Sequence, residues 1–151
     1  MISPTYPREI LSNGTVRLTA EECSFVFSRP APGILLVTVA GHDRGQFGMG
    51  ALDEIVCALN RERPLELFVD TREAVGVAVN VRQDWTRFFA GNRANLSAVH
   101  VLTRSKIVHL AVAVAQLFSR TGDLIRLYSQ PEAFQARLDR ARDSSVSVPR
   151  P

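Results

Sequence analysis

The chain has 151 residues, of which 46% are hydrophobic and 22% are charged. A chain of this length buries about two-thirds of its unfolded surface, so it needs no disulfide or metal to hold a core, and its composition excludes disordered, collagen-like and coiled-coil proteins. The formal net charge is +3, but all but one of the 18 cations are arginines scattered along the chain. Nucleic-acid-binding proteins cluster such charges on one face. We therefore expect one globular domain that does not bind nucleic acid.

The two cysteines, Cys23 and Cys57, have no Cys or His neighbours at metal-ligand spacing. We expect two buried, reduced thiols, no metal and no cofactor. The first residues lack the charged and apolar regions of a secretory signal. The most apolar run, 107–118, is too short to span a bilayer, which needs about 20 residues. These features predict a cytoplasmic protein that does not insert into a membrane.

The first half of the chain predicts an arm, a hairpin and one strand-helix-strand unit. Residues 1–14 hold two prolines and an Asn13-Gly14 turn signal, and are predicted to form a flexible arm. Alternating apolar residues predict a hairpin of strands at 16–20 and 23–28. The following elements are a central β-branched strand at 34–40, a helix at 47–59 that ends before Pro64, and a strand at 65–70 that ends in Asp70.

The second half predicts two further strands, each followed by a helix. A loop from Thr71 to Asn80 precedes a helix that carries Val81, Trp85, Phe88 and Phe89 at helical spacing. The remaining elements are a strand at 97–102, an apolar helix capped by Ser105 that stops at Gly122, a strand at 124–128, and a helix to 141 opened by Ser129-Gln-Pro-Glu132. Residues 143–151 have no core-forming period and are predicted to be a disordered tail.

This order of strands and helices is that of an α/β fold with right-handed crossovers between parallel strands. The strand leading into Gly41, the strand Arg63–Asp70 that ends in an acid, and the capped last helix together resemble the STAS domain of bacterial anti-sigma-factor antagonists. The resemblance covers residues 15–142. It implies one STAS-like domain with a mixed, mostly parallel sheet of about five strands, an N-terminal hairpin and four helices.

The resemblance also implies a non-enzymatic regulatory role with a protein partner, such as a regulatory kinase or an anti-sigma-type factor. Phosphorylatable members of that family carry a serine at the start of the second helix. Here Val77-Ala-Val-Asn80-Val81 contains no hydroxyl, and Asn80 serves at best as a helix cap. We therefore expect that the phosphorylation switch is missing. Thr71, beside Asp70, is the nearest hydroxyl and a weak candidate for modification.

Ligands of parallel open sheets bind beyond the carboxyl ends of the strands. The predicted ligand or partner edge consists of His42, Asp43, Arg44, Asp70, Thr71, Arg72, Arg104, Ser105 and Lys106. Two uses stay open for it: a polar face that binds a protein, or a site for a small anion near Arg104 and Lys106. No recognised nucleophile stands beside His42-Asp43, so no catalytic residue is assigned. His100, inside an apolar strand, is expected to be a hydrogen-bonded buried residue rather than a ligand.

Two groups of apolar residues are candidates for a self-association interface. Trp85, Phe88 and Phe89 form the first group, which alternatively belongs to the core. The second is the helix at 107–118, where ten of twelve residues are apolar, more than one buried face requires. Val112 and Val114 are placed at a symmetric dimer interface on this basis. The N-terminal arm is the alternative cover for that helix.

Three functions are compatible with the sequence. The first is a non-enzymatic interaction domain, expected to form a homodimer. The second is a binding or sensing domain for an apolar or anionic small molecule, whose pocket would need a mostly apolar lining. The third is a hydrolase or transferase, which would need convergent titratable groups with perturbed pKa values in a cleft.

Overall fold

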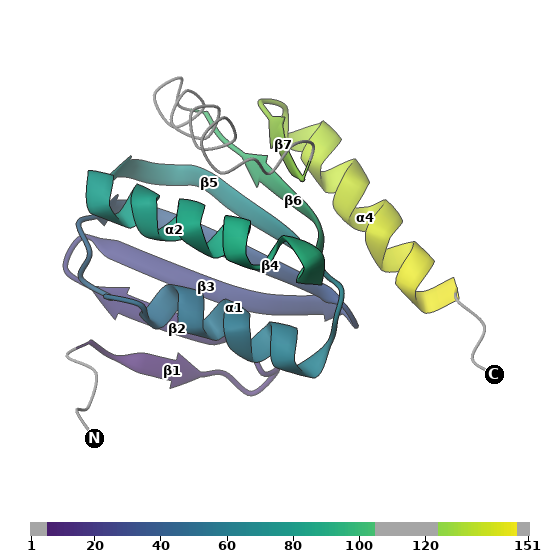
Figure 1. Cartoon of the computed structure of the whole chain (residues 1–151), viewed down its shortest axis with the longest axis horizontal. Helices are drawn as coiled ribbons and strands as arrows, with labels where there is room; N and C mark the ends of the chain where they lie inside the picture. The colour runs from purple at the N-terminus through teal and green to yellow at the C-terminus, as the bar shows by residue number, and fades with distance from the viewer. Residues whose placement is uncertain (1–5, 105–123, 148–151) are drawn as a thin grey trace.

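The computed structural model describes residues 6–104 and 124–147 (Figure 1). In this part of the chain, seven strands form one sheet in the order β1-β2-β3-β4-β5-β6-β7. Strands β1 to β4 are antiparallel to their neighbours, and β4 to β7 are parallel. The elements are β1 (Arg8–Ile10), β2 (Val16–Ala20), β3 (Cys23–Ala31), β4 (Ile34–Asp43), α1 (Gly50–Arg61), β5 (Leu65–Val77), α2 (Val79–Gly91), the 3-10 turn η1 (Arg93–Asn95), β6 (Leu96–Leu102), β7 (Ile125–Tyr128) and α4 (Pro131–Ser147).

The predicted hairpin is formed by β2 and β3, which are joined by a two-residue turn. Ala20 pairs with Cys23, and Glu22 in the turn has a φ of 59°. Along β3, Cys23, Phe25 and Phe27 are buried while the residues between them are half-buried. This alternation is typical of a strand with one face on the core.

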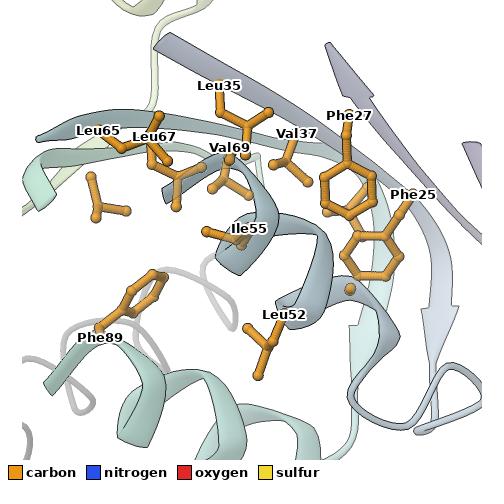
Figure 2. Close-up of a cluster of buried hydrophobic side chains, with 14 of the residues drawn as sticks. Phe25, Phe27, Leu35, Val37, Leu52, Ile55, Leu65, Leu67, Val69 and Phe89 are labelled. Carbon is orange, nitrogen blue, oxygen red and sulfur yellow. The ribbon is translucent and has the colours of Figure 1, made fainter. Parts of the chain in front are cut away.

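The larger core lies between the sheet and helices α1 and α2, which cover the same face (Figure 1). Both helices are crossover connections between parallel strands that advance in one direction, so right-handedness places them on one face. Inward residues of β3, β4 and β5 meet residues of α1 and α2 there (Figure 2). The strands contribute Phe25, Phe27, Leu35, Val37, Leu65, Leu67 and Val69, and the helices contribute Leu52, Ile55 and Phe89.

The opposite face carries α4. Phe134, Leu138 and Ala141 recur at helical spacing on this helix and pack against Phe68 and Leu102 of the sheet. Phe68 alternates with the core residues Leu67 and Val69 along β5, so it projects from the other face. Helix α4 therefore forms a second layer behind the sheet.

The structure differs from the predicted elements at both ends of the chain. Arg8–Ile10, within the predicted arm, forms β1 and pairs with β2. Helix α4 continues to Ser147, past the start of the predicted tail at Asp143. The described residues contain three α-helices rather than the four expected, because the helix predicted from Ser105 onward lies outside them.

Candidate functional site

Strand β5 does not end at Asp70, as the sequence predicted, but continues to Val77. Beyond Asp70 it pairs only with β4, since β6 ends at Leu102 opposite Asp70. Two irregularities insert one extra residue each into β5 between its pairings with Thr38 and His42. Bulges of this kind bend a strand and redirect its side chains. Asp70, Thr71 and Arg72 are therefore parts of a bulged strand rather than a loop.

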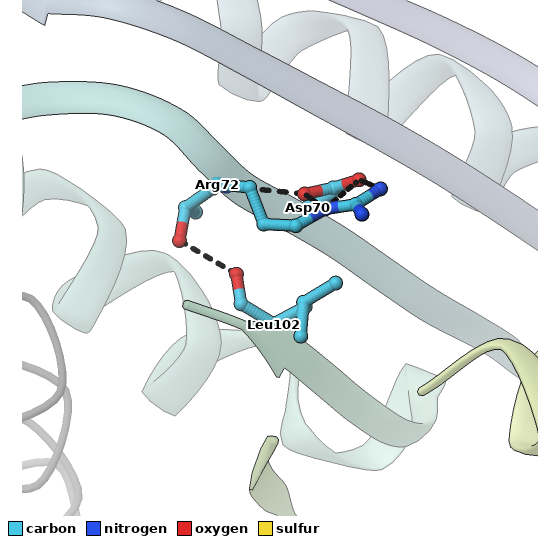
Figure 3. Close-up of polar contacts among 4 residues, drawn as sticks. Asp70, Arg72 and Leu102 are labelled. Carbon is cyan, nitrogen blue, oxygen red and sulfur yellow. Dashed lines mark hydrogen bonds and ion pairs between the residues drawn. The ribbon is translucent and has the colours of Figure 1, made fainter. Parts of the chain in front are cut away.

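Arg72 and Asp70 neutralise each other at the first bulge (Figure 3). The Arg72 guanidinium donates from Nε to Oδ1 at 3.1 Å and from Nη2 to Oδ2 at 2.8 Å, and its backbone N–H donates to Oδ1 at 3.1 Å. The hydrogen bond to Asp70 raises the pKa of Arg72, which is already protonated at neutral pH. The Thr71 hydroxyl donates to the Leu102 carbonyl at 2.7 Å, so it is not a free hydroxyl.

His42, Asp43 and Arg44 form a separate, closed turn at the end of β4. The buried Asp43 carboxylate accepts a hydrogen bond from the Gly45 N–H at 3.0 Å, and burial raises the pKa of Asp43. Arg44 is exposed and pairs with Glu22 at 3.1 Å. These groups close the connection from β4 to α1, and no base faces a nucleophile there.

The predicted edge is therefore two clusters. Asp70 pairs with Thr38 in β4, and Asp43 lies five residues further along that strand. At 3.3 Å per residue the two carboxylates are separated by about 16 Å along the sheet. Arg104 is exposed after β6, and Ser105, Lys106, Val112 and Val114 lie outside the described residues.

Three exposed apolar residues lie near the carboxyl ends of β4 and β5, and the sequence pattern does not single them out. Met49 before α1, Val75 in β5 and Val79 at the start of α2 are 52%, 79% and 58% exposed. We call these three residues the apolar edge. The Ala78 N–H donates to the Asp43 carbonyl at 2.8 Å, which ties the start of α2 to the end of β4. Each residue is an ordinary strand or helix former, so only the topology brings them to one edge.

The aromatic residues of α2 face the core. Trp85 stacks on Phe25 with ring centroids 6.2 Å apart and meets Phe89 edge-on at 5.8 Å. Phe89 is buried, which corrects its assignment to an interface, while Trp85 and Phe88 are half-buried and pack against the core. The alternative in which this group belongs to the core is the one that the packing favours.

His100 is fully buried at the centre of a polar chain on the α4 face. Its Nδ1 lies 2.8 Å from the Tyr128 hydroxyl, and its Nε2 lies 2.7 Å from Glu66 Oε2. Arg137 of α4 forms an ion pair with the same Glu66 oxygen at 2.9 Å, and the imidazole stacks on Phe68. The prediction of a hydrogen-bonded buried histidine is confirmed.

Glu66 is ionised within this polar chain of hydrogen-bonded residues. Burial opposes its charge, but the hydrogen bond from His100 and the positive charge of Arg137 outweigh burial and lower the pKa of Glu66. An ionised Glu66 accepts from the His100 Nε2–H, and His100 Nδ1 is hydrogen-bonded to the Tyr128 hydroxyl. Glu66, His100, Tyr128 and Arg137 then each have a partner within this polar chain. The polar chain therefore joins β5, β6, β7 and α4.

A groove with a volume of ≈ 570 Å³ runs between α4 and strands β4 to β6. Leu36, Leu102, Phe134 and Leu138 supply apolar lining, and the Asp70–Arg72 pair, Glu132 and Asp139 supply charge. Asp70 and Arg72 belong to the predicted ligand edge, whereas the α4 residues that line the groove with them do not.

Neither a protein-family model nor a curated protein matches the sequence. Among the solved structures that resemble the fold are the following two. An anti-sigma factor antagonist from Mycobacterium paratuberculosis superposes with a TM-score of 0.58 at 12% identity, covering 81% of this chain and 99% of its own. An uncharacterized protein with a SpoIIAA-like fold from Shewanella loihica gives a TM-score of 0.54 at 12% identity, covering 91% of this chain and 98% of its own. The fold is STAS-like.

The STAS-like fold confirms the predicted α/β class with a mostly parallel sheet, although the described part has seven strands rather than about five. In that part no helix is long and apolar enough to cross a membrane. Nor do residues 6–104 and 124–147 contain a group of three or more His, Cys, Asp or Glu side chains placed to hold a metal ion. Cys57 is exposed, contrary to prediction, whereas Cys23 is buried as expected.

Proposed function

We propose that this protein is a non-enzymatic regulatory module that binds another protein, such as a regulatory kinase or an anti-sigma-type factor, through the apolar edge. The STAS-like fold, shared with an anti-sigma factor antagonist, supports the regulatory role. The exposure of Met49, Val75 and Val79 at one edge carries the proposal. Apolar side chains gathered on a surface are typical of contacts with other proteins.

The position of the apolar edge strengthens this assignment. Only five large hydrophobic residues in the described part are exposed, and three of them belong to this edge. The edge lies at the carboxyl ends of β4 and β5, where parallel sheets present their binding residues. A closed turn at Asp43 and the first turn of α2 hold the edge in place, so a partner meets a preformed surface.

The proposed module works without a phosphorylation switch at the start of α2. Ala78 is the N-cap of this helix and makes no side-chain cap, and Asn80 lies inside the helix rather than capping it. Residues 77–82 contain no serine or threonine, and the Thr71 hydroxyl is engaged by the Leu102 carbonyl. Mass spectrometry of the protein isolated from its host should find residues 71–82 unphosphorylated, and a stoichiometric phosphate on Thr71 would restore the switch.

We also propose that the protein forms a homodimer. We propose that it acts in the cytoplasm and does not bind nucleic acid. Two-fold dimers are the commonest soluble oligomers. The half-buried Trp85 and Phe88 contribute less free surface than the sequence suggested, because they pack on the core. Sedimentation equilibrium at micromolar concentration decides between monomer and dimer.

Small-molecule binding is the second candidate function, and the groove beside α4 favours it. A volume of ≈ 570 Å³ lies in the range of ordinary ligand sites, roughly 300–1,000 Å³. Carboxylates on its rim repel an anion, so the anionic ligand that the sequence left open does not suit this groove, whereas an apolar one does.

Co-purification from the native host tests the proposed function. The wild-type chain should retain a partner in stoichiometric amount, and the double variant Val75→Glu with Val79→Glu should lose it, because two buried charges disrupt an apolar contact. Ile10→Glu is the matched control, since Ile10 is 64% exposed on β1, at the far edge of the sheet. Retention of the partner by the double variant would remove the apolar edge from the proposal.

A further inference from the structure

The groove beside α4 combines an apolar floor with a negatively charged rim. Leu36 and Leu102 come from the sheet, and Phe134 and Leu138 come from the helix. The groove is lined by three carboxylates, of Asp70, Glu132 and Asp139, and by one guanidinium, of Arg72. The lining therefore has a net charge of about −2, in a chain whose formal net charge is +3.

The three carboxylates differ in how far they are already paired. Asp70 is bound bidentately by Arg72. Asp139 accepts from Gln135 at 2.9 Å and from Arg142 at 2.9 Å. Glu132, in the first turn of α4, makes no ion pair within residues 6–104 and 124–147, although its charge is among the causes that raise the pKa of Arg72. Glu132 is thus the carboxylate available to a cationic group that enters the groove.

The sheet beside the groove is open to solvent. Val26, Thr38 and Asp70 pair in register across β3, β4 and β5, and all three are only half-buried. This row continues the floor of the groove onto the face of the sheet that α4 leaves uncovered. An extended peptide bound in the groove could continue along this row of sheet residues, whereas a compact small molecule in the groove would not contact the row.

We propose that this groove binds a short basic segment of a partner protein, with a lysine or arginine side chain in the groove. The long aliphatic stem of such a side chain packs on the half-buried Leu36, and its charged head meets Glu132. The site is distinct from the apolar edge. The proposal requires only that the ligand of the groove is a protein segment. It does not depend on which partner binds the apolar edge.

A nuclear magnetic resonance titration of the isotope-labelled full chain tests the proposal. The probe is the capped peptide Leu-Arg-Ala-Leu-Arg, and the comparison peptide has Glu in place of Arg. We expect shifts of the amides of Leu102 and of the first turns of α4 with the basic peptide only. Binding should weaken as salt is raised, because part-exposed charges are screened.

Two variants locate the binding site. Glu132→Gln should lower the affinity for the basic peptide by about fivefold, which is the effect of losing one part-exposed ion pair. Glu9→Gln removes another exposed carboxylate, on β1, and should leave the affinity unchanged. The double variant Val75→Glu with Val79→Glu should also bind the peptide normally, which separates this proposal from the proposed function.

Several outcomes would overturn the inference. Equal shifts with the acidic peptide would show that charge plays no part. Equal binding of spermidine would show that the groove selects a free amine rather than a protein segment. Shifts confined to another surface, or an unchanged affinity in Glu132→Gln, would place the basic peptide elsewhere. Circular dichroism of Glu132→Gln checks that α4 is intact, which is expected for an exposed position.

Discussion

Replacing Glu66 by alanine tests whether the buried polar chain on the α4 face stabilises the fold. Glu66 Oε2 lies 2.7 Å from His100 Nε2, to which it is hydrogen-bonded, and 2.9 Å from Arg137 Nη2, with which it forms an ion pair. His100 is fully buried, so its Nε2–H loses its hydrogen-bond partner once the carboxylate is removed. The Arg137 side chain remains 27% exposed and can turn toward solvent.

The two losses differ in size for this reason. An orphaned buried donor costs about 1–3 kcal/mol, and a part-exposed ion pair contributes about 0–1 kcal/mol. We expect Glu66→Ala to lower the free energy of unfolding by about 1–4 kcal/mol. Glu66→Gln keeps an acceptor for His100 but loses the charge, so we expect a loss of about 1–2 kcal/mol.

Urea unfolding followed by circular dichroism measures these differences. Glu9→Ala is the control, because Glu9 and Arg17 are both exposed and 3.9 Å apart, and we expect a change below about 0.5 kcal/mol. The pKa of Glu66 is lowered in the folded state. Its charge therefore stabilises the fold above the ordinary glutamate pKa of about 4.3, and this contribution disappears as pH falls through the lowered value. A loss in Glu66→Ala no larger than in Glu9→Ala would refute the reasoning.

Three other predictions concern the turn at β4 and the thiols. Asp43→Asn should be neutral or stabilising at pH 7, because burial raises the pKa of Asp43 and its ionised form disfavours folding until pH falls through that pKa. The asparagine amide oxygen still accepts a hydrogen bond from the Gly45 N–H. Urea unfolding measured as a function of pH checks this prediction. Gly41→Ala should destabilise by more than about 1 kcal/mol in thermal unfolding, because Gly41 has a φ of 85° and an added Cβ would overlap the Glu22 carbonyl oxygen. Iodoacetamide at pH 8 should alkylate the exposed Cys57 and spare Cys23, since burial raises the pKa of Cys23 to about 12; equal labelling by mass spectrometry would contradict the burial.

Periodicity predicted the elements that have long apolar patterns. The alternation in β3, the β-branched run of β4 and the helical spacing in α1 and α2 are each strong over six or more residues. Strand β1 was missed because its three residues are all exposed and show no buried period. The continuation of β5 past Asp70 was missed because Arg72, Glu73 and Gly76 resemble a loop.

The polar chain and the groove depend on register and on long-range packing. Glu66, His100 and Tyr128 lie on three strands, and Arg137 lies on a helix. A visible signal exists, since Glu66 and Phe68 are two residues apart in a strand and so share a face. Nothing local shows which histidine or arginine meets that face. For the same reason Met49, Val75 and Val79 appear unrelated until the strand order places them at one edge.

A photo-crosslinking amino acid at position 79 tests the central claim, that a protein partner binds the apolar edge. Val79 is 58% exposed at the start of α2, so the substitution leaves the core intact. In cells of the native host, irradiation should give one discrete protein adduct from position 79 and none from position 10 on β1. A yield at position 10 equal to that at position 79, or no adduct from position 79 while the chain is folded and abundant, would contradict the claim.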